Sequence, residues 1–447
     1  MLPDPYPVKP WTAPCQGEVR LPGSKSLTNR ALLVAAMCDG AVRLQGSLFS
    51  RDTSILMDSL VKLGFDVRSS AGDETIEIDG LGGNIPRSHA NIHVGNAGTA
   101  ARFLAAFVCL HPDGEYHFDG DEEMRKRPMG GLLDTLESLG ARFEFKGEHG
   151  CFPFCVRTNG LSGGRWEIDA SASSQMLSAL MLVAPKASGP VTIDASGTRP
   201  AFVEMTAGLM KQFNISIEGD PGSGYQIPGE QSYVCPDDGA FWIEPDVTAA
   251  SYFMVLPLVV GGSLRILGMR NGMLQGDTAF ASVMTKLGMQ MQDDGDGWTV
   301  SYIETQGGAR LVENFRTFSD TFLTLAAISP LLTCPVRIDE IGHTRFQETD
   351  RIDAVTTELK RIGAVADCGE DHVEVCPFPA GYVPPAGSVV QTYRDHRVAM
   401  SFAMLGCSPR FGSSPWLSIA DPGCCGKTFP AFFEVLESLY RYSHDKE

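Results

Sequence analysis

The sequence predicts an α/β protein that contains six copies of one supersecondary unit. One helix of each copy ends at a residue that recurs at intervals of 74 to 77 positions. Glycine or asparagine at such an end favours the left-handed backbone that stops a helix, and the alternating residues that follow are typical of a strand. Repetition at this period predicts a repeat architecture. The six helix ends are Gly64, Gly140, Asn214, Gly288, Gly363 and Tyr440.

A second helix in each unit is nearly continuous in apolar residues, and its first turn is polar or rich in glycine. An apolar surface on all sides predicts that these helices are buried. Their first-turn N–H groups have no partner within the helix and carry a partial positive charge, so the helix starts are expected to bind anions. The starting segments begin at Gly23, Gly95, Ser171, Glu244, Ser319 and Arg394.

Length and composition agree with this architecture. The 447 residues divide into two sets of three units, and 43% hydrophobic content is enough for a sizeable core. The formal net charge of −18 argues against nucleic-acid binding, which needs a basic surface. An anionic ligand would therefore need a local group of cations.

Cysteine usage and the apolar runs predict a cytoplasmic protein. Twelve cysteines occur in a long chain with no secretion signal, which favours reduced thiols. No apolar run reaches the roughly 18 residues of a membrane span, and the N-terminal segment lacks the basic start of a signal peptide. We expect neither membrane nor nucleic-acid partners.

Two short patterns suggest other chemistry and are set aside. Gly426–Thr428 resembles part of a phosphate-binding loop, but that motif needs a glycine where Asp421 stands. His89 and His93 are spaced like metal ligands, yet they lie in a predicted strand with no acidic ligand close in sequence. We expect surface histidines there and no metal.

Basic residues cluster near the helix starts, and the segments that contain them resemble the enolpyruvyl transferase family, in particular its shikimate-3-phosphate branch. The segments span residues 21 to 430 in the family's order. They are Leu21–Arg30, Gly95–Arg102, Arg125–Met129, Ser173–Gln175, Gln275–Asp277, Glu348–Arg351, Asp395–Met400 and Gly426–Pro430.

The resemblance implies a two-domain inside-out α/β barrel, with six repeats of a βαβαββ unit, three per domain. Residues 22–243 would form one domain, and residues 1–21 with 244–447 the other. The active site is expected in the interdomain cleft, without metal or organic cofactor, in a monomer.

The resemblance also implies a reaction. The 5-hydroxyl of shikimate-3-phosphate adds to phosphoenolpyruvate, and the adduct then eliminates phosphate. Both substrates are multiply charged anions, and guanidinium groups pair with carboxylate and phosphate in a bidentate way.

Site residues follow by matching motifs. The shikimate-3-phosphate contacts implied are Lys25, Ser26, Arg30, Ser173, Ser174, Gln175 and Asp320. The phosphoenolpyruvate contacts implied are Lys25, Gly98, Arg127, Gln175, Arg351, Arg397 and Lys427. The catalytic residues implied are Lys25, Asp320, Glu348 and Lys427. Asp320 would be the base for the hydroxyl and Glu348 would serve the methylene carbon, although Asp320 also suits a helix N-cap.

The chain departs from the family pattern at Gln347, His343, Phe202 and Phe103. Gln347 replaces a lysine, which removes a cation from the expected phosphate site; a protonated His343 would restore part of that charge. A non-catalytic or altered-acceptor relative that binds shikimate-type anions is therefore one alternative. UDP-N-acetylglucosamine enolpyruvyl transferase is another, disfavoured because the loop from Asp119 to Pro128 has no reactive cysteine.

Overall fold

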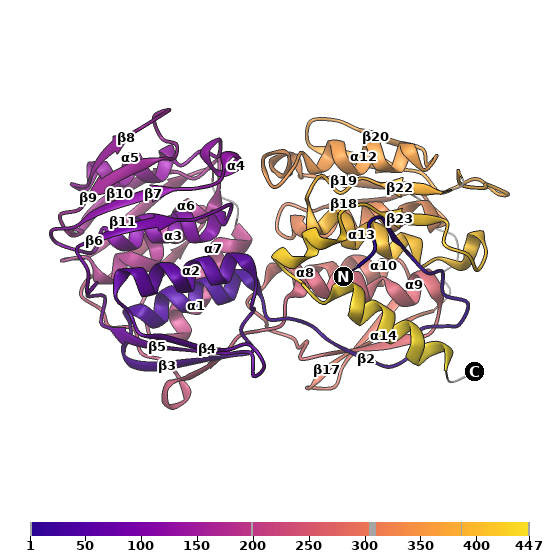
Figure 1. Cartoon of the computed structure of the whole chain (residues 1–447), viewed down its shortest axis with the longest axis horizontal. Coiled ribbons are helices and arrows are strands. Elements are labelled where there is room, and N and C mark those ends of the chain that lie inside the picture. Colours follow the sequence, from indigo (N-terminus) through magenta and orange to yellow (C-terminus); the bar gives the residue numbers. More distant parts are fainter. Residues whose placement is uncertain (1, 198–199, 304–309, 386, 446–447) are drawn as a thin grey trace. The chain divides into compact units, whose positions relative to one another are not determined.

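The computed structural model describes residues 2–197, 200–303, 310–385 and 387–445. The chain divides into two compact units (Figure 1). Unit 1 comprises Met1–Pro22 and Pro245–Glu447, and unit 2 comprises Gly23–Glu244.

Three four-stranded sheets form in the described part of unit 2. In each, the first two strands are parallel and the second pairs antiparallel with the last strand of the repeat. The first sheet has β14 (Ala240–Trp242), β3 (Asp39–Gln45), β5 (Thr75–Leu81) and β4 (Val67–Ser70). The second has β6 (His89–His93), β7 (Glu115–Asp119), β9 (Phe154–Arg157) and β8 (Arg142–Phe145). The third has β10 (Gly164–Asp169), β11 (Val191–Ser196), β13 (Gly224–Ile227) and β12 (Glu218–Asp220).

Unit 1 also has three sheets among its described residues. One contains β2 (Glu18–Arg20), β15 (Ser263–Leu267), β17 (Gly297–Tyr302) and β16 (Met289–Asp293). Another contains β18 (Leu311–Asn314), β19 (Val336–Asp339), β21 (His372–Val375) and β20 (Ala366–Cys368). The third is three-stranded, with β22 (Ser388–Val390), β23 (Leu417–Ile419) and β1 (Tyr6–Pro7).

The first and fourth repeats borrow their first strand from a distant part of the chain. β14 pairs in parallel with β3, so the end of unit 2 completes its first repeat. β2 pairs in parallel with β15, so the N-terminal segment completes the first repeat of unit 1. In the sixth repeat, β1 takes the place beside β23 that a late strand of the repeat occupies elsewhere.

The predicted buried helices form the centre of each unit. In unit 2, α3 (Gly98–Val108) packs against α1 (Lys25–Met37) and α6 (Ser174–Val183). In unit 1, α13 (His396–Gly406) packs against α11 (Phe322–Ile328), α8 (Val247–Met254) and α9 (Leu256–Val260). Every residue of α3, α11 and α13 is buried, because these helices are apolar apart from a few polar residues.

The remaining helices are the ones with the predicted end residues. They are α2 (Arg51–Leu63), α5 (Gly130–Ser138), α7 (Pro200–Gln212), α10 (Phe280–Lys286), α12 (Arg351–Arg361) and α14 (Phe432–His444), with a short α4 (Glu122–Arg125) before α5. Five predicted end residues have positive φ: Gly64 at 101°, Gly140 at 107°, Asn214 at 63°, Gly288 at 86° and Gly363 at 81°. The sixth prediction is wrong, because α14 continues through Tyr440 to His444; tyrosine has no preference for the left-handed conformation.

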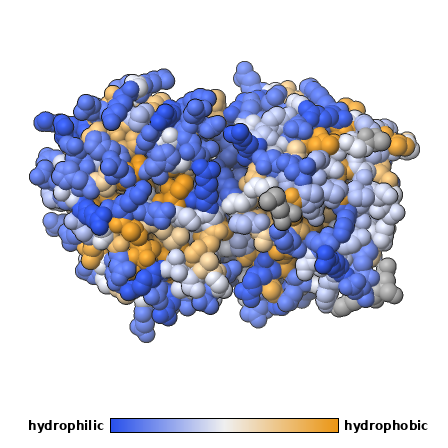
Figure 2. All heavy atoms as spheres, in the orientation of Figure 1, coloured by the Kyte–Doolittle hydropathy of each residue, from blue (hydrophilic) through white to orange (hydrophobic). Residues whose placement is uncertain are grey.

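Surface and cysteines agree with the composition. Hydrophilic residues cover most of the face seen in Figure 2, with smaller hydrophobic patches among them. All twelve cysteines are free. Across the described residues, we find no helix with both the length and the apolar character to cross a membrane.

Candidate active site

Lys25 and Ser26 lie in the first turn of α1 in unit 2. The Ser24 side chain caps this helix by accepting a hydrogen bond from the Leu27 N–H. Lys25 Nζ is 3.7 Å from Asp52 Oδ2, a carboxylate in the first turn of α2. Both Lys25 and Ser26 are partly exposed. Both residues lie at a helix start, and their anion-binding role stays a prediction.

Arg30 lies one turn further along α1 and is only 1% exposed. Its Nε donates to Thr206 Oγ1 at 2.8 Å and its Nη1 to the Ser26 carbonyl at 3.1 Å. Burial lowers the pKa of Arg30 to about 9. Contact with a substrate would require its N–H groups to exchange partners, so its predicted binding role stays a prediction.

Gly98, Arg127 and Gln175 come together around a fourth residue, Arg102. Arg102 Nη1 donates to Gln175 Oε1 at 3.0 Å and to the Gly98 carbonyl at 3.1 Å. A Cβ at Gly98 would lie 2.9 Å from Nη1 of both Arg102 and Arg127. Burial, followed by repulsion from Arg127, lowers the pKa of Arg102 to about 9. A side chain at position 98 would therefore displace one or both guanidinium groups.

Ser173 and Ser174 begin α6, beside Gln175. The Ser173 hydroxyl accepts a hydrogen bond from the Gln175 N–H at 3.3 Å, which fixes the first turn. Ser174 is buried, whereas Ser173 and Gln175 are partly exposed. The predicted serine pair therefore lies at a helix start in the same unit as Lys25.

In unit 1, Arg351 forms the centre of an ion-pair cluster. It is 1% exposed and contacts three carboxylates. Its Nε donates to Asp395 Oδ2 at 2.8 Å, its Nη2 to Glu348 Oε2 at 2.9 Å and its Nη1 to Asp320 Oδ1 at 3.0 Å. Burial lowers the pKa of Arg351, but the carboxylates, Asp395 first, outweigh burial and raise it.

Two more predicted cations join this cluster. Arg397 Nη2 donates to Asp320 Oδ2 at 2.8 Å, and Lys427 Nζ donates to Glu348 Oε1 at 2.8 Å. Burial lowers the pKa of Arg397, and Asp320 more than compensates. Five predicted site residues therefore lie in one network: Asp320, Glu348, Arg351, Arg397 and Lys427.

Asp320 lies in a 3₁₀ turn, Ser319–Thr321, directly before α11. Both of its carboxylate oxygens accept from guanidinium groups. Ser319, the residue before it, shares a hydrogen bond of 2.7 Å with His343 Nε2. His343 therefore contacts the residue that directly precedes Asp320. In a separate contact, Gln347 Oε1 accepts a hydrogen bond from Arg351 Nη1.

Asp277 is a buried carboxylate beside this network. It accepts a hydrogen bond from Thr248 Oγ1 at 2.6 Å. Burial, followed by repulsion from Asp320, raises the pKa of Asp277 to about 7. Since a neutral acid is favoured when a carboxyl is buried beside an ionised one, Asp277 limits the negative charge near Asp320.

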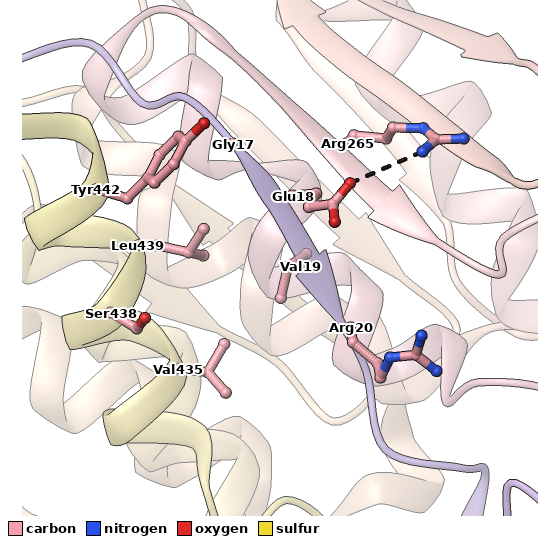
Figure 3. Close-up of a pocket in the computed structure, with 9 residues that line it drawn as sticks. All are labelled: Gly17, Glu18, Val19, Arg20, Arg265, Val435, Ser438, Leu439 and Tyr442. Carbon is pink, nitrogen blue, oxygen red and sulfur yellow. Dashed lines mark ion pairs between the residues drawn. The ribbon is translucent and has the colours of Figure 1, made fainter. Parts of the chain in front are cut away.

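A separate groove of about 530 Å³ lies in unit 1 and contains none of the predicted site residues (Figure 3). It runs between β2 and α14, where Glu18 pairs with Arg265 at 3.8 Å. We assign it no role in the chemistry.

The sequence matches the family EPSP synthase (3-phosphoshikimate 1-carboxyvinyltransferase) over residues 11–436. The chain belongs to the EPSP synthase family. It is 46% identical to 3-phosphoshikimate 1-carboxyvinyltransferase of Opitutus terrae, over 99% of each chain. It is 37% identical to the Nostoc punctiforme protein of the same name, over 95% of this chain and 97% of that one.

The fold is also similar to that of EPSP synthase from Acinetobacter baumannii, with a TM-score of 0.79, 21% identity and 97% of each chain covered. The predicted fold class and enzyme class, an enolpyruvyl transferase, are therefore confirmed. Membership of the EPSP synthase family does not favour the UDP-N-acetylglucosamine alternative.

Sequence reasoning did not assign a role to Asp52, Arg102, Asp277 or Asp395, although each contacts or adjoins a predicted residue. Asp395 was detectable in principle, because an aspartate directly before an apolar helix is a typical N-cap. It does cap α13, accepting from the Arg397 N–H at 2.8 Å. Its second contact, with Arg351, has no local signal in the sequence.

Proposed function

We propose that the chain transfers the enolpyruvyl group of phosphoenolpyruvate to the 5-hydroxyl of shikimate-3-phosphate, with release of inorganic phosphate. The family match over residues 11–436 carries this proposal, because it includes every motif segment between residues 21 and 430. The ion-pair network of unit 1 supports it, since it holds an acceptor, a donor and three cations suited to anionic substrates.

Substrate binding divides between the units. Unit 2 supplies shikimate-3-phosphate contacts from the starts of α1 and α6: Lys25, Ser26, Arg30, Ser173, Ser174 and Gln175. Asp320 of unit 1 binds the ring hydroxyls. The phosphoenolpyruvate contacts are Lys25, Gly98, Arg127 and Gln175 of unit 2, with Arg351, Arg397 and Lys427 of unit 1.

In the first step, the oxygen of the 5-hydroxyl attacks the central carbon of phosphoenolpyruvate. Asp320 accepts the hydroxyl proton, and Glu348 in its protonated form gives its proton to the methylene carbon, which becomes methyl. Arg351 and Arg397 favour an ionised Asp320, the form that can accept a proton. A tetrahedral adduct with its phosphate still attached results.

In the second step, the bond from the central carbon to the phosphate oxygen breaks and the methyl group returns one proton to Glu348. Lys427 donates a proton to the departing phosphate. The contact of Lys427 Nζ with Glu348 Oε1 supports these two proton-transfer roles, because it places the two side chains next to each other.

The cations are already paired in the structure. Arg351, Arg397 and Lys427 face Asp320, Glu348 and Asp395, so their charges are nearly balanced. Binding of the anionic substrates would therefore exchange some of these carboxylate contacts for substrate carboxylate and phosphate. Such exchange avoids the cost of burying unpaired cations before the substrate arrives.

The non-catalytic alternative rests on Gln347, which replaces a lysine of the family pattern. Its side-chain oxygen accepts from Arg351, so it occupies a donor without adding positive charge. A relative that only binds shikimate-type anions would not release phosphate from the two substrates.

Release of inorganic phosphate from a mixture of both substrates tests the proposal. We expect release by the unmodified protein and its loss in Asp320→Ala and Lys25→Met. Asp294→Ala and Lys286→Met serve as controls, because each removes one surface ion-pair partner outside the site. Full activity in either site variant would refute the role assigned, and no release by the unmodified chain would favour the non-catalytic alternative.

A further inference from the structure

One sheet of unit 2 brings together three metal-ligating side chains, none of which is proposed for catalysis. Glu115 and His117 are two apart on β7, so their side chains leave the same face of the strand. Cys155 of β9 is the direct cross-strand partner of His117. Tyr116 and Phe118, which alternate with them along β7, are buried on the opposite face.

The ligand atoms of these residues lie close to one another. One carboxylate oxygen of Glu115, one ring nitrogen of His117 and Sγ of Cys155 all lie within 4.8 Å of each other. Glu115 Oε1 and His117 Nε2 are 3.5 Å apart. Sulfur and nitrogen ligands of a tetrahedral zinc ion are separated by about 3.5 Å, as the bond lengths require. Small side-chain rotations would therefore bring the three atoms to bonding positions.

Neighbouring residues hold the carboxylate in place. Arg157 Nε donates to Glu115 Oε2 at 2.9 Å, which leaves Oε1 on the side of His117. An outer partner that orients a ligand in this way is typical of metal sites.

Two of the three side chains are reachable from solvent, whereas Cys155 is buried and 5% exposed. The His117 side chain is 44% exposed and that of Glu115 is 33% exposed. His117 also lines an open groove of about 540 Å³. A hydrated ion could therefore approach without rearrangement of the backbone, and a water molecule could complete its coordination.

We propose that Glu115, His117 and Cys155 form a binding site for Zn²⁺ that links β7 to β9. A thiolate, an imidazole and a carboxylate together favour zinc and similar transition metals over Mg²⁺ or Ca²⁺, which prefer oxygen ligands. On binding, the zinc–sulfur bond forms and the thiol proton of Cys155 is released to water. The site stabilises the sheet and takes no part in enolpyruvyl transfer.

His89 and His93, whose spacing suggested metal ligands, do not belong to this cluster. They lie on β6, opposite Glu115 and Asp119. His93 Nδ1 accepts from the Gly95 N–H, and His89 Nδ1 shares a hydrogen bond with Ser88. The site proposed on β7 and β9 therefore uses neither histidine of this pair.

Titration of the metal-free, reduced full chain with Co²⁺ tests the proposal, since Co²⁺ replaces Zn²⁺ and shows thiolate coordination in its absorption spectrum. We expect one Co²⁺ per chain with a thiolate charge-transfer band that Zn²⁺ removes and Mg²⁺ does not. Cys155→Ala should lose the band, and Cys151→Ala should keep it. Cys151 is a matched control because it is also a buried, free thiol of the same unit.

Two further variants keep the test decisive if Cys155→Ala fails to fold. His117→Gln and Glu115→Gln should each weaken Zn²⁺ binding by at least the roughly 10- to 100-fold typical of disturbed metal sites. Zn²⁺ should also raise the urea midpoint of the unmodified chain but not of these variants, because a ligand of the folded state stabilises it. A missing thiolate band, or one retained in Cys155→Ala, would overturn the proposal.

Discussion

Asp395 and Arg351 form a fully buried ion pair in unit 1, with Nε and Oδ2 separated by 2.8 Å and the aspartate side chain 0% exposed. The same carboxylate caps α13 through the Arg397 N–H. Asp395 therefore positions two of the arginines proposed to bind phosphoenolpyruvate, although it is not itself proposed to touch the substrate.

Replacing Asp395 by alanine should destabilise unit 1 strongly. Removal of one partner of a buried ion pair costs about 3–5 kcal/mol, because the other charge remains buried. Asp395→Asn should cost less, since an amide oxygen can still accept the cap hydrogen bond. Urea unfolding measures both. Equal losses for the two variants would contradict the separate contributions of charge and cap.

Lys427→Met should reduce kcat/KM for phosphoenolpyruvate by about 10- to 100-fold, the equivalent of one charged hydrogen bond of about 1.5–3 kcal/mol. The side chain of Lys427 is 16% exposed, so the protein should still fold. Steady-state kinetics and circular dichroism provide the measurements. Lys286→Met, which also breaks a lysine–glutamate pair, should leave the kinetics unchanged.

Gly98→Ala should raise KM for phosphoenolpyruvate more than KM for shikimate-3-phosphate. The new Cβ would push against Nη1 of Arg102 and Arg127, and Arg127 is proposed to bind phosphoenolpyruvate. Both atoms are at the ends of flexible side chains, so displacement of the guanidinium groups is expected instead of unfolding. Gly72→Ala is the control, because a Cβ there meets no atom within 4 Å. Unchanged KM values would show that Arg127 is not needed in its present position.

Asp277 should make stability depend on pH between about 4 and 7. Its pKa rises from an ordinary value of 3.8 to about 7 in the folded protein, first because of burial. The folded state then binds more protons than the unfolded state in this window, so the Asp277 contribution to stability is present at low pH and is lost as pH rises through about 7. The free energy of unfolding of Asp277→Asn should fall less between pH 5 and pH 7 than that of the unmodified protein. Parallel pH profiles for the two proteins would rule out this coupling.

Some features of the fold are readable from single positions. Gly64, Gly140 and Gly363 each stop a helix because only local backbone conformation matters at such a residue. The apolar helices are likewise predictable, since α3 is buried along its whole length and its sequence is apolar except for Thr99 and Arg102. Tyr440 shows the limit of this reasoning, because a periodic position without a glycine does not end the helix.

The pairing of strands from distant segments of the chain could not be predicted in the same way. β2 and β14 complete repeats whose other elements lie far along the chain, and β1 pairs with β23 near the C-terminus. Short strands of two or three residues carry too little hydrophobic pattern to specify a partner.

By itself, the sequence determined the six-unit α/β architecture, the family and the basic residues at the helix starts, because these depend on local pattern and on motifs. The tertiary structure determined which charged side chains contact one another. Arg351 contacts Asp395, which is 44 positions away in the sequence, and His117 lies opposite Cys155 on the neighbouring strand. Such contacts depend on strand register and helix packing, which bring together residues that no local interaction relates.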